Sequence, residues 1–393
     1  MTRFGLDEFL EHFPRALHGK ELGVLCHAAS VTSSYAHITE ALWKHPDCRL
    51  KAVLGPQHGL FGQTQDNMVE WKGYRHPRYD IPVYSLYGET RKPRACMLEG
   101  LDALVIDLQD VGARPYTYIW TVKLCLEACA ELSVPVWLLD RPNPIGALAF
   151  DGPPLEEEFH SFVGGAPIPL CHRMTMGEMA RLIRDLYVPD VQLTVVPMKE
   201  WWRDSLWCET GLPWVLPSPN MPTPDTALVY PGMVLLEATN LSEGRGTTRP
   251  FELFGAPYID SDLFRDALYD GGFSGCIFRE HHFIPAFQKW AGEYCHGMQV
   301  HVTAPRLFAP VRTAAIIIAA AKAASQGRFA FNDPPYEYET EKMPFDILSG
   351  GSILRENLEA DGEWKKLFEK WAAYHTEFGK VLNDYALYPE RLP

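Results

Sequence analysis

The stretch ALVIDLQDVGAR, residues 103–114, decides the fold, because an uninterrupted apolar run ends abruptly in polar residues. Short apolar runs of this kind are typical of strands that are buried on both faces of a parallel sheet. Four further runs share this character, and they are Leu22–Cys26, Leu50–Leu54, Pro82–Leu86 and Val134–Leu139. Helical patterns such as Ala36–Trp43 and Tyr118–Leu132 lie between the runs. The alternation predicts an α/β fold with a doubly wound parallel sheet.

Thr175–Tyr187 is predicted to be a helix that begins with a capping box formed by Thr175 and Glu178, which gives Glu178 a structural role. A change of composition after this helix indicates a domain boundary. Residues from about 190 to 257 are rich in Pro, Gly and Trp. We therefore expect an N-terminal domain over residues 1–189 and a smaller, mixed α/β domain over residues 190–393. In the second domain, one strand and two helices are predicted at Gln299–Thr303, Val311–Ala324 and Glu363–Leu382.

Composition and charge exclude several classes of protein. A formal net charge of −14 argues against nucleic-acid binding, which requires basic residues to neutralise phosphates. The nine cysteines lack CxxC spacing and are odd in number, so they indicate a reducing compartment rather than a metal site or a disulfide framework. Met1–Pro14 is acidic and unlike a secretory signal, and the aliphatic run Ala314–Ala321 is too short to span a bilayer. These features predict a cytoplasmic protein that binds neither metal nor membrane.

Polar loops follow three of the predicted strands. They are Gly55–Gly59, Asp107–Arg114 and Asp140–Asn143. Open parallel sheets bind ligands at the carboxyl ends of their strands, so we expect these loops to meet in one crevice. Charged residues at strand ends are equally typical of structural ion pairs.

The segment NLSEGRGTTR, residues 240–249, is the densest polar cluster of the chain. It combines a carboxylate, two guanidinium groups, three hydroxyls and an amide in one loop, which suits a polyol or amide ligand. We expect it to join the three strand loops. The segment lacks the ending of a P-loop, and neither HExxH nor GxSxG occurs in the chain. Carboxylates in a crevice fit glycoside hydrolysis, but they also fit other chemistry.

Five segments together resemble the exo-β-N-acetylmuramidases, a family of glycoside hydrolases of peptidoglycan recycling that was long of unknown function. The segments are residues 83–88, 106–112, 139–144, 217–223 and 240–252. The resemblance implies a Rossmann-like N-terminal domain, a smaller α/β C-terminal domain and a site between them. It also implies cleavage of terminal β-1,4-linked N-acetylmuramic acid without a metal or organic cofactor. Many members are exported, whereas the start of this chain indicates a cytoplasmic enzyme that acts on imported fragments.

The chain departs from the family pattern at residues 57–59, where it reads QHG and members usually read EHG. An amide cannot deliver the proton that the leaving oxygen needs, so another group must act as the acid. Glu70 and Glu243 are predicted to flank the sugar as paired carboxylates, and His58 and Asp110 are predicted to support them.

The remaining polar residues of these loops are predicted to bind substrate: Gln57, Arg114, Tyr116, Asp140, Arg141, Asn143, Asn220, Asn240 and Arg245. One arginine is expected to recognise the lactyl carboxylate that distinguishes N-acetylmuramic acid from N-acetylglucosamine. A planar guanidinium binds a carboxylate through two hydrogen bonds, which lysine does not reproduce. The candidates are Arg114, Arg141 and Arg245.

Two other functions stay open. The first is a muropeptide-binding protein that kept the pocket and lost the chemistry at residue 57. The second is a glycosidase of the same fold that acts on another N-acetylhexosamine. A small muropeptide or disaccharide is the expected partner of the leading hypothesis. Retaining, inverting and substrate-assisted routes are all compatible with the sequence, as are several fragment lengths and any oligomeric state.

Overall fold

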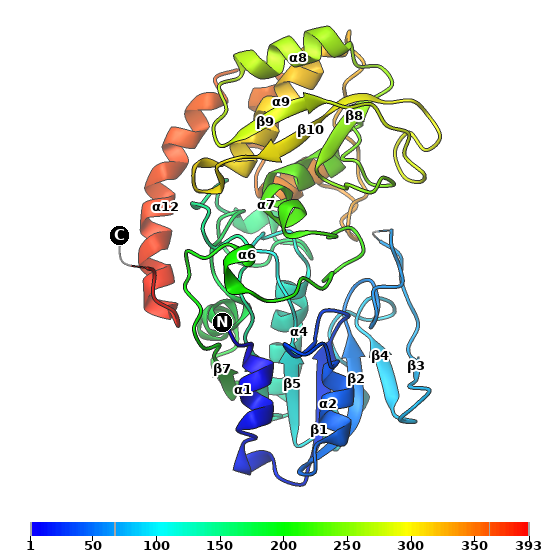
Figure 1. Ribbon diagram of the computed structural model, residues 1–393, viewed down its shortest axis with the longest axis vertical. Helices are drawn as coiled ribbons and strands as arrows, with labels where there is room; N and C mark the ends of the chain where they lie inside the picture. Colours follow the sequence, from blue (N-terminus) through cyan, green and yellow to red (C-terminus); the bar gives the residue numbers. More distant parts are fainter. Residues whose placement is uncertain (1, 67, 361, 392–393) are drawn as a thin grey trace.

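The apolar runs of the N-terminal half form one large sheet. The computed structural model in Figure 1 describes residues 2–66, 68–360 and 362–391. In spatial order the strands of this sheet are β3 (Tyr74–Arg75), β4 (Pro82–Ser85), β2 (Cys48–Gly55), β1 (Lys20–Cys26), β5 (Ala103–Asp107), β6 (Val136–Leu139) and β7 (Leu193–Val196). Neighbouring strands are parallel except for β3 and β4. Each of the predicted runs forms a strand, and the α/β class is confirmed.

Helices cover both faces of the large sheet. On one face, Leu104 and Ile106 of β5 pack in an apolar cluster with the helices α4 (Tyr118–Glu131) and α5 (Met176–Tyr187). On the other face, Val105 packs in a separate cluster with α1 (Gly5–Glu11) and α2 (Ile38–Lys44). Because successive side chains of a strand point to opposite faces, one apolar run serves both layers. The sheet is therefore doubly wound, as predicted.

A second, smaller sheet lies at the opposite end of the molecule (Figure 1). Its antiparallel strands are β8 (Leu253–Ala256), β10 (His296–Val302) and β9 (Cys276–Glu280), in that spatial order. The apolar cluster on the α4 side of the large sheet extends without a break into this end of the molecule, where it includes α9 (Pro310–Ala324). A shared core of this kind holds the two ends of the molecule in one arrangement.

The remaining helices surround these two sheets. They are η1 (Arg15–Leu17), α3 (Ala95–Leu98), η2 (Glu157–Phe159), α6 (Trp207–Thr210), α7 (Pro224–Met233), η3 (Val234–Ala238), α8 (Ser261–Asp270), η4 (Pro305–Leu307), α10 (Pro344–Ser349), α11 (Ile353–Glu359) and α12 (Lys365–Tyr385). Within the described ranges, no helix has both the length and the apolar character that a bilayer crossing requires.

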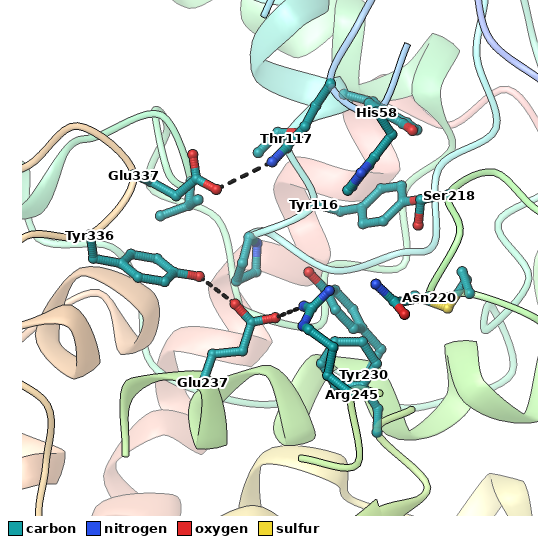
Figure 2. A pocket seen from close by; sticks show the side chains of 16 residues that line it. His58, Tyr116, Thr117, Ser218, Asn220, Tyr230, Glu237, Arg245, Tyr336 and Glu337 are labelled. Atoms are coloured by element: carbon teal, nitrogen blue, oxygen red, sulfur yellow. Dashed lines mark hydrogen bonds and ion pairs between the residues drawn. The ribbon is translucent and has the colours of Figure 1, made fainter. Parts of the chain in front are cut away.

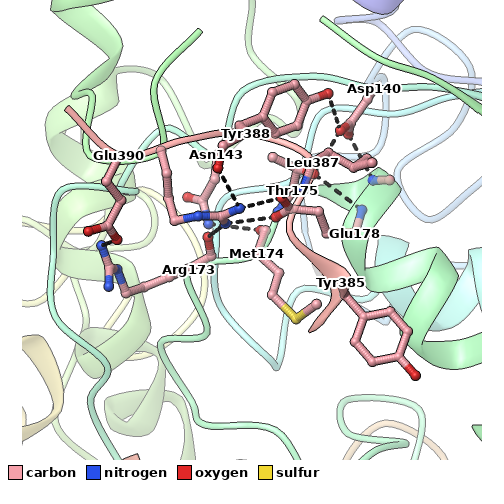
Figure 3. A network of polar contacts seen from close by, with 12 residues as sticks. Asp140, Asn143, Arg173, Met174, Thr175, Glu178, Tyr385, Leu387, Tyr388 and Glu390 are labelled. Atoms are coloured by element: carbon pink, nitrogen blue, oxygen red, sulfur yellow. Dashed lines mark hydrogen bonds and ion pairs between the residues drawn. The ribbon is translucent and has the colours of Figure 1, made fainter. Parts of the chain in front are cut away.

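The C-terminal segment returns to the large sheet. The helix α12 packs against α5, and Tyr388 beyond it reaches the end of β6. There the Tyr388 hydroxyl donates a hydrogen bond to Asp140 at 2.7 Å and accepts one from the Met198 amide at 3.0 Å (Figure 3). Strand β7 lies just after residue 189, where the sequence placed the domain boundary, and pairs with β6 in the large sheet. The large sheet thus contains chain from both sides of that position.

The N-terminus of α5 carries the capping box that the sequence predicted. The Thr175 hydroxyl accepts a hydrogen bond from the Glu178 amide at 3.2 Å, and the Thr175 amide donates to the Glu178 carboxylate at 3.0 Å. This reciprocal arrangement satisfies two amides that a helix end leaves unpaired. Glu178 also forms a buried ion pair with Arg203, in which Nη1 of the arginine lies 2.8 Å from the carboxylate. A structural role for Glu178 is confirmed.

We predict that Tyr388→Phe destabilises the protein, because it removes one hydroxyl that serves two buried partners. The loss is expected to be about 1–3 kcal/mol in the free energy of unfolding, the usual cost of leaving buried polar groups unsatisfied. Denaturant unfolding measures it. The control is Tyr35→Phe, since the Tyr35 side chain is 64% exposed. Equal stability of the two variants would show that the C-terminal segment does not anchor the sheet.

Candidate active site

A polar pocket lies where the loops of the large sheet meet residues from the second half of the chain. Figure 2 shows side chains from both parts pointing into it. It is lined by Gln57, His58, Pro115, Tyr116, Thr117, Tyr118, Val163, Ser218, Asn220, Met221, Tyr230, Glu237, Arg245, Phe251, Tyr336 and Glu337.

Glu337 enters this pocket from a tight turn. Tyr336 and Glu339 pair across the turn, and the two residues between them, Glu337 and Tyr338, have φ angles of +44° and +70°. Left-handed conformations of non-glycine residues carry a cost and gather at functional sites. The Glu337 side chain is buried and accepts hydrogen bonds from the Tyr87 hydroxyl at 2.8 Å and from the Gln57 amide at 3.3 Å. Burial raises the pKa of Glu337 to about 7, so the carboxyl carries a proton in part of the molecules at neutral pH.

Gln57 is held in one orientation by its neighbour. The Thr117 hydroxyl donates a hydrogen bond to the Gln57 side-chain oxygen at 2.7 Å, which leaves the amide nitrogen as the group that faces Glu337. The departure from the family pattern therefore places a hydrogen-bond donor beside the carboxyl of Glu337, where a glutamate would place a second acidic group.

A second carboxylate, Glu237, enters the pocket from η3. It accepts hydrogen bonds from the Arg245 guanidinium at 2.5 Å and from the Tyr336 hydroxyl at 2.8 Å (Figure 2). Neither Glu237 nor Glu337 was predicted from the sequence as a site residue. A lone charge within the apolar run Val234–Ala238 was a usable signal for the first. For Glu337, the only signal in the sequence was its position between Tyr336 and Tyr338.

Arg245 is the one candidate arginine for carboxylate recognition that lines the pocket. Besides its contact with Glu237, its Nε donates to Glu243 at 3.3 Å, and its guanidinium lies 5.4 Å from the centroid of the Phe251 ring. The glycine that follows it allows this position. Gly246 has a φ of +85°, and a Cβ there would lie 2.5 Å from the Phe287 carbonyl oxygen.

Glu243, predicted as a catalytic carboxylate, lies behind the pocket wall. Besides its contact with Arg245, it accepts a hydrogen bond from Lys289 at 2.9 Å. Burial alone would raise the pKa of Glu243, but the positive charges of Lys289 and Arg245 lower it below its usual value. The geometry gives Glu243 a positioning role, because it stays ionised and holds the guanidinium that lines the pocket.

Glu70, the other predicted catalytic carboxylate, is exposed and lies outside this pocket. It accepts a hydrogen bond from the Tyr338 hydroxyl at 3.1 Å. Together with Trp71 and Tyr84 it lines a separate cavity beside β4. The contact with Tyr338 connects Glu70 to the turn that carries Glu337.

His58 lines the pocket in its neutral form. Burial lowers the pKa of His58 to about 4, and its Nδ1 lies 2.8 Å from the Thr64 carbonyl oxygen. Since that oxygen can only accept, Nδ1 carries the proton and Nε2 is left as an acceptor. His58 has a φ of +71°, the left-handed backbone of the loop after β2. His58 can therefore accept a hydrogen bond from a substrate hydroxyl.

Tyr116 and Asn220 also line the pocket, as substrate-binding residues were predicted to do. The Tyr116 hydroxyl lies beside Ser218 (Figure 2). The Asn220 amide donates to the Gln65 carbonyl oxygen at 2.7 Å, which ties its loop to the loop after β2.

The loop after β6 does not line the pocket, contrary to the expectation that all three strand loops would. Asp140 accepts hydrogen bonds from the Gly177 amide and the Tyr388 hydroxyl (Figure 3). Arg141 forms a buried, two-pronged ion pair with Asp107, with distances of 2.5 and 2.8 Å. These contacts hold the loop against the N-terminus of α5 and the sheet, outside the pocket.

Two more predicted residues are also held by the chain itself, outside the pocket. The Asn143 amide donates to the Met174 carbonyl oxygen at 3.0 Å. Asn240 accepts from the Ala330 amide at 3.1 Å and donates to the Arg328 carbonyl oxygen at 2.8 Å. The loops in which these asparagines lie are thereby fixed in place.

Asp110 and Arg114 belong to the predicted loop after β5, but only the residues that follow them, Pro115–Tyr118, reach the pocket. Asp110 accepts a hydrogen bond from the Gly112 amide at 2.7 Å and lies 3.5 Å from His172. Arg114 is fully buried and donates to four main-chain carbonyl oxygens at distances of 2.7 to 3.2 Å. The loop itself is therefore structural. In the part of the chain that the structure describes, no group of three or more His, Cys, Asp or Glu side chains is placed to hold a metal ion.

The fold and the pocket together define a class of protein. A carboxyl group that holds a proton near neutral pH, a second carboxylate and a guanidinium converge between two α/β parts, which is an arrangement that suits glycoside hydrolysis. The chain belongs to the exo-β-N-acetylmuramidase NamZ family. The model of the N-terminal part of that family matches residues 22–225, and the model of its C-terminal part matches residues 228–388. The predicted family and the predicted enzyme class, a glycosidase, are confirmed.

Relatives of known sequence and structure agree with this assignment. The chain is 40% identical over 385 residues to the peptidoglycan β-N-acetylmuramidase NamZ of Bacillus subtilis strain 168, covering 98% of this chain and 91% of that protein. A crystal structure of a DUF1343 family protein from Bacteroides fragilis NCTC 9343 superposes with a TM-score of 0.87 at 30% identity, over 98% of this chain and 99% of the other. A second such protein from that organism gives a TM-score of 0.76 at 25% identity over all of both chains.

We predict that His58 does not titrate between pH 5.5 and 8, because burial keeps its imidazole neutral, with a pKa of about 4. Nitrogen-detected NMR of the imidazole rings measures this directly, and His58→Asn identifies the signal. The Nδ1-protonated form is expected throughout that range. A midpoint near 6.5, the usual value for histidine, would contradict the neutral assignment.

Proposed function

We propose that the protein is an exo-acting glycoside hydrolase that releases N-acetylmuramic acid from the non-reducing end of β-1,4-linked peptidoglycan fragments. Membership of the NamZ family and the name of the B. subtilis relative support this substrate. A small muropeptide or disaccharide is the partner that this function implies. The single structural observation that carries the proposal is the presence of Arg245 in the pocket wall.

Arg245 is suited to the group that distinguishes N-acetylmuramic acid, which is its lactyl carboxylate. Arg114 and Arg141 are committed to main-chain carbonyl oxygens and to Asp107, whereas Arg245 presents its guanidinium to the pocket. Its contacts with Glu237 and Glu243 use Nη2 and Nε, and they fix the guanidinium in the pocket wall. A buried guanidinium that is fixed in this way can bind an incoming carboxylate with little loss of side-chain freedom.

The charges around Arg245 balance before any ligand binds. Glu237 and Glu243 carry two negative charges, and Arg245 and Lys289 carry two positive charges in the same network of contacts. A protonated Glu337 adds no charge. An anionic sugar therefore does not meet a net negative pocket, although the whole chain has a formal net charge of −14.

Release of one sugar from a defined disaccharide tests the proposed function. N-acetylmuramyl-β-1,4-N-acetylglucosamine is incubated with the protein, and the products are identified by mass spectrometry beside a calorimetric binding titration. We expect free N-acetylmuramic acid and N-acetylglucosamine. Binding without turnover would instead support a muropeptide-binding protein. Faster turnover of the corresponding N-acetylglucosaminide would support a glycosidase for another N-acetylhexosamine.

We predict that Arg245→Lys weakens catalysis on the muramic substrate far more than on the glucosamine analogue. Lysine keeps the charge but loses the two-pronged geometry, and an unpaired charged partner costs about 1–3 kcal/mol, roughly a 5- to 150-fold loss in kcat/KM. Aryl glycosides of the two sugars provide the comparison. The matched control is Arg249→Lys, on the same loop, where the arginine side chain is 46% exposed. Equal losses on both sugars would exclude lactyl recognition by Arg245.

We further propose that the protein acts in the cytoplasm on imported fragments. All nine cysteines are free, seven of them buried, which suits a reducing compartment. Fractionation of cells that carry a tagged full-length protein would locate it, and recovery from an exported fraction would contradict this proposal.

A further inference from the structure

Glu337 faces two cavities. It lines the polar pocket that contains Arg245, and it also lines a neighbouring cavity on the other side of the turn Tyr336–Glu339. Glu337 is only 4% exposed, and it is the residue common to the linings of both cavities. An exo-acting glycosidase needs this geometry, because the terminal sugar and the leaving sugar occupy adjoining spaces on either side of the bond that breaks.

The neighbouring cavity combines aromatic surfaces with cationic donors. Trp120, Phe162 and Tyr338 line it together with Arg91 and Lys123. The Arg91 guanidinium lies 3.7 Å from the centroid of the Tyr338 ring and 5.7 Å from that of Phe162. Apolar rings suit the faces of a sugar, and guanidinium and ammonium groups donate to its hydroxyl and acetamido oxygens. The cavity therefore suits a neutral N-acetylated sugar.

We propose that Glu337 is the acid that protonates the leaving oxygen, and that the cavity with Arg91 holds the leaving sugar while the pocket with Arg245 holds the terminal one. The proposal rests on the proposed function and names the residue that performs its first step. Gln57 and Tyr87 are positioning residues, because both donate hydrogen bonds to Glu337.

The step conserves atoms and charge. The bond between the anomeric carbon and the bridging oxygen breaks, its electron pair moves to that oxygen, and the Glu337 proton joins it there. The leaving sugar departs as a neutral alcohol, and Glu337 becomes a carboxylate. Water then supplies a hydroxyl to the anomeric carbon, and the remaining proton of that water restores the acid form of Glu337 through solvent. No oxidant, reductant or metal takes part.

The surroundings of Glu337 suit both of its protonation states. Burial and, to a smaller extent, the nearby Glu237 raise the pKa of Glu337, which comes to about 7, so the carboxyl carries a proton in part of the molecules at neutral pH. The Tyr87 hydroxyl and the Gln57 amide, like the charge of Arg91, act in the opposite direction and stabilise the carboxylate that remains after transfer. Two donors are thus in place before the charge develops, which is how enzymes stabilise charge efficiently.

Other titratable groups near Glu337 also face it. Tyr336 and Tyr230 lie in the same pocket, and Tyr338 lies next to it on the turn. Burial raises the pKa of each of these tyrosines, so all three stay neutral through the range in which Glu337 titrates. We therefore assign to Glu337 the alkaline limb of the pH profile, which is the decrease in activity above about pH 7.

The main test compares Glu337→Gln on two substrates. The disaccharide needs a proton on its leaving oxygen, whereas the 4-nitrophenyl muraminide has an acidic leaving group that needs little help. We expect kcat/KM on the disaccharide to fall by roughly 10²–10⁴-fold, the usual contribution of general acid catalysis. The kcat/KM on the aryl substrate should fall far less. The decrease in disaccharide turnover near and above pH 7 should disappear from the pH profile. The matched control is Glu341→Gln, an exposed glutamate just beyond the same turn.

The outcomes separate this proposal from the proposed function. Thermal melting and titration with N-acetylmuramic acid first establish that the variant is folded and binds the terminal sugar. If the parent protein cleaves the disaccharide but Glu337→Gln keeps its turnover, or loses equally on both substrates, Glu337 is not the acid and the proposed function stands. If the parent binds the disaccharide and is inert, both proposals fail. Turnover in Gln57→Glu alone would then identify residue 57 as the missing acid.

The cavity assignment has its own test in Arg91→Met, which keeps the aliphatic stem and removes the donors. We expect KM for the disaccharide to rise about tenfold and affinity for free N-acetylmuramic acid to stay unchanged. Because Arg91 lowers the pKa of Glu337, its loss should also move the alkaline limb to higher pH. Weaker binding of N-acetylmuramic acid with an unchanged KM for the disaccharide would assign the terminal sugar to this cavity and overturn the proposal.

Discussion

The pocket depends on the way in which the buried guanidinium of Arg114 is satisfied. One of its terminal nitrogens donates to two carbonyl oxygens in the N-terminal half, and the other donates to Leu348 and Ser349 at the end of α10. A buried charge is costly unless it is hydrogen-bonded, and these four bonds hold both halves of the chain around the two terminal nitrogens of Arg114. Pro115–Tyr118, which follow Arg114 in the chain, and Glu337, which precedes α10, line one pocket.

Two buried glutamates show how local partners decide the role of a side chain. Glu243 lies among the cations Lys289 and Arg245, which lower its pKa despite burial, and it acts as a fixed negative charge. Glu337 has neutral hydrogen-bond donors as its direct contacts, and its pKa rises to about 7. The same functional group is thus a permanent anion at one position and a proton carrier at the other, because burial penalises an anion that has no cation in contact.

Most of the charged groups at the strand ends serve the fold. Arg141 pairs with Asp107 in the sheet, and Asp140 binds Tyr388 from the far end of the chain. The rule that ligands bind at the carboxyl ends of parallel strands holds for the loop after β2 and for the segment after Arg114. It fails for the loop after β6, because the N-terminus of α5 and the C-terminal segment offer its polar groups nearer partners. The residue type at a strand end predicts that a polar contact forms there, but it does not predict which group is the partner.

Apart from the edge strands β3 and β7, the sequence by itself determined the strands of the large sheet, the cap of α5 at Thr175 and the family. These features depend on neighbours in the chain, where apolar runs and the spacing of side chains are directly visible. Only the tertiary structure decided which carboxyl groups enter the pocket. Gln57 and Glu337 are 280 residues apart, and Glu337 comes from a short turn that has no strand or helix pattern. The raised pKa of Glu337 follows from burial by distant parts of the chain. Burial of this kind cannot be predicted from the residues that flank Glu337 in the sequence.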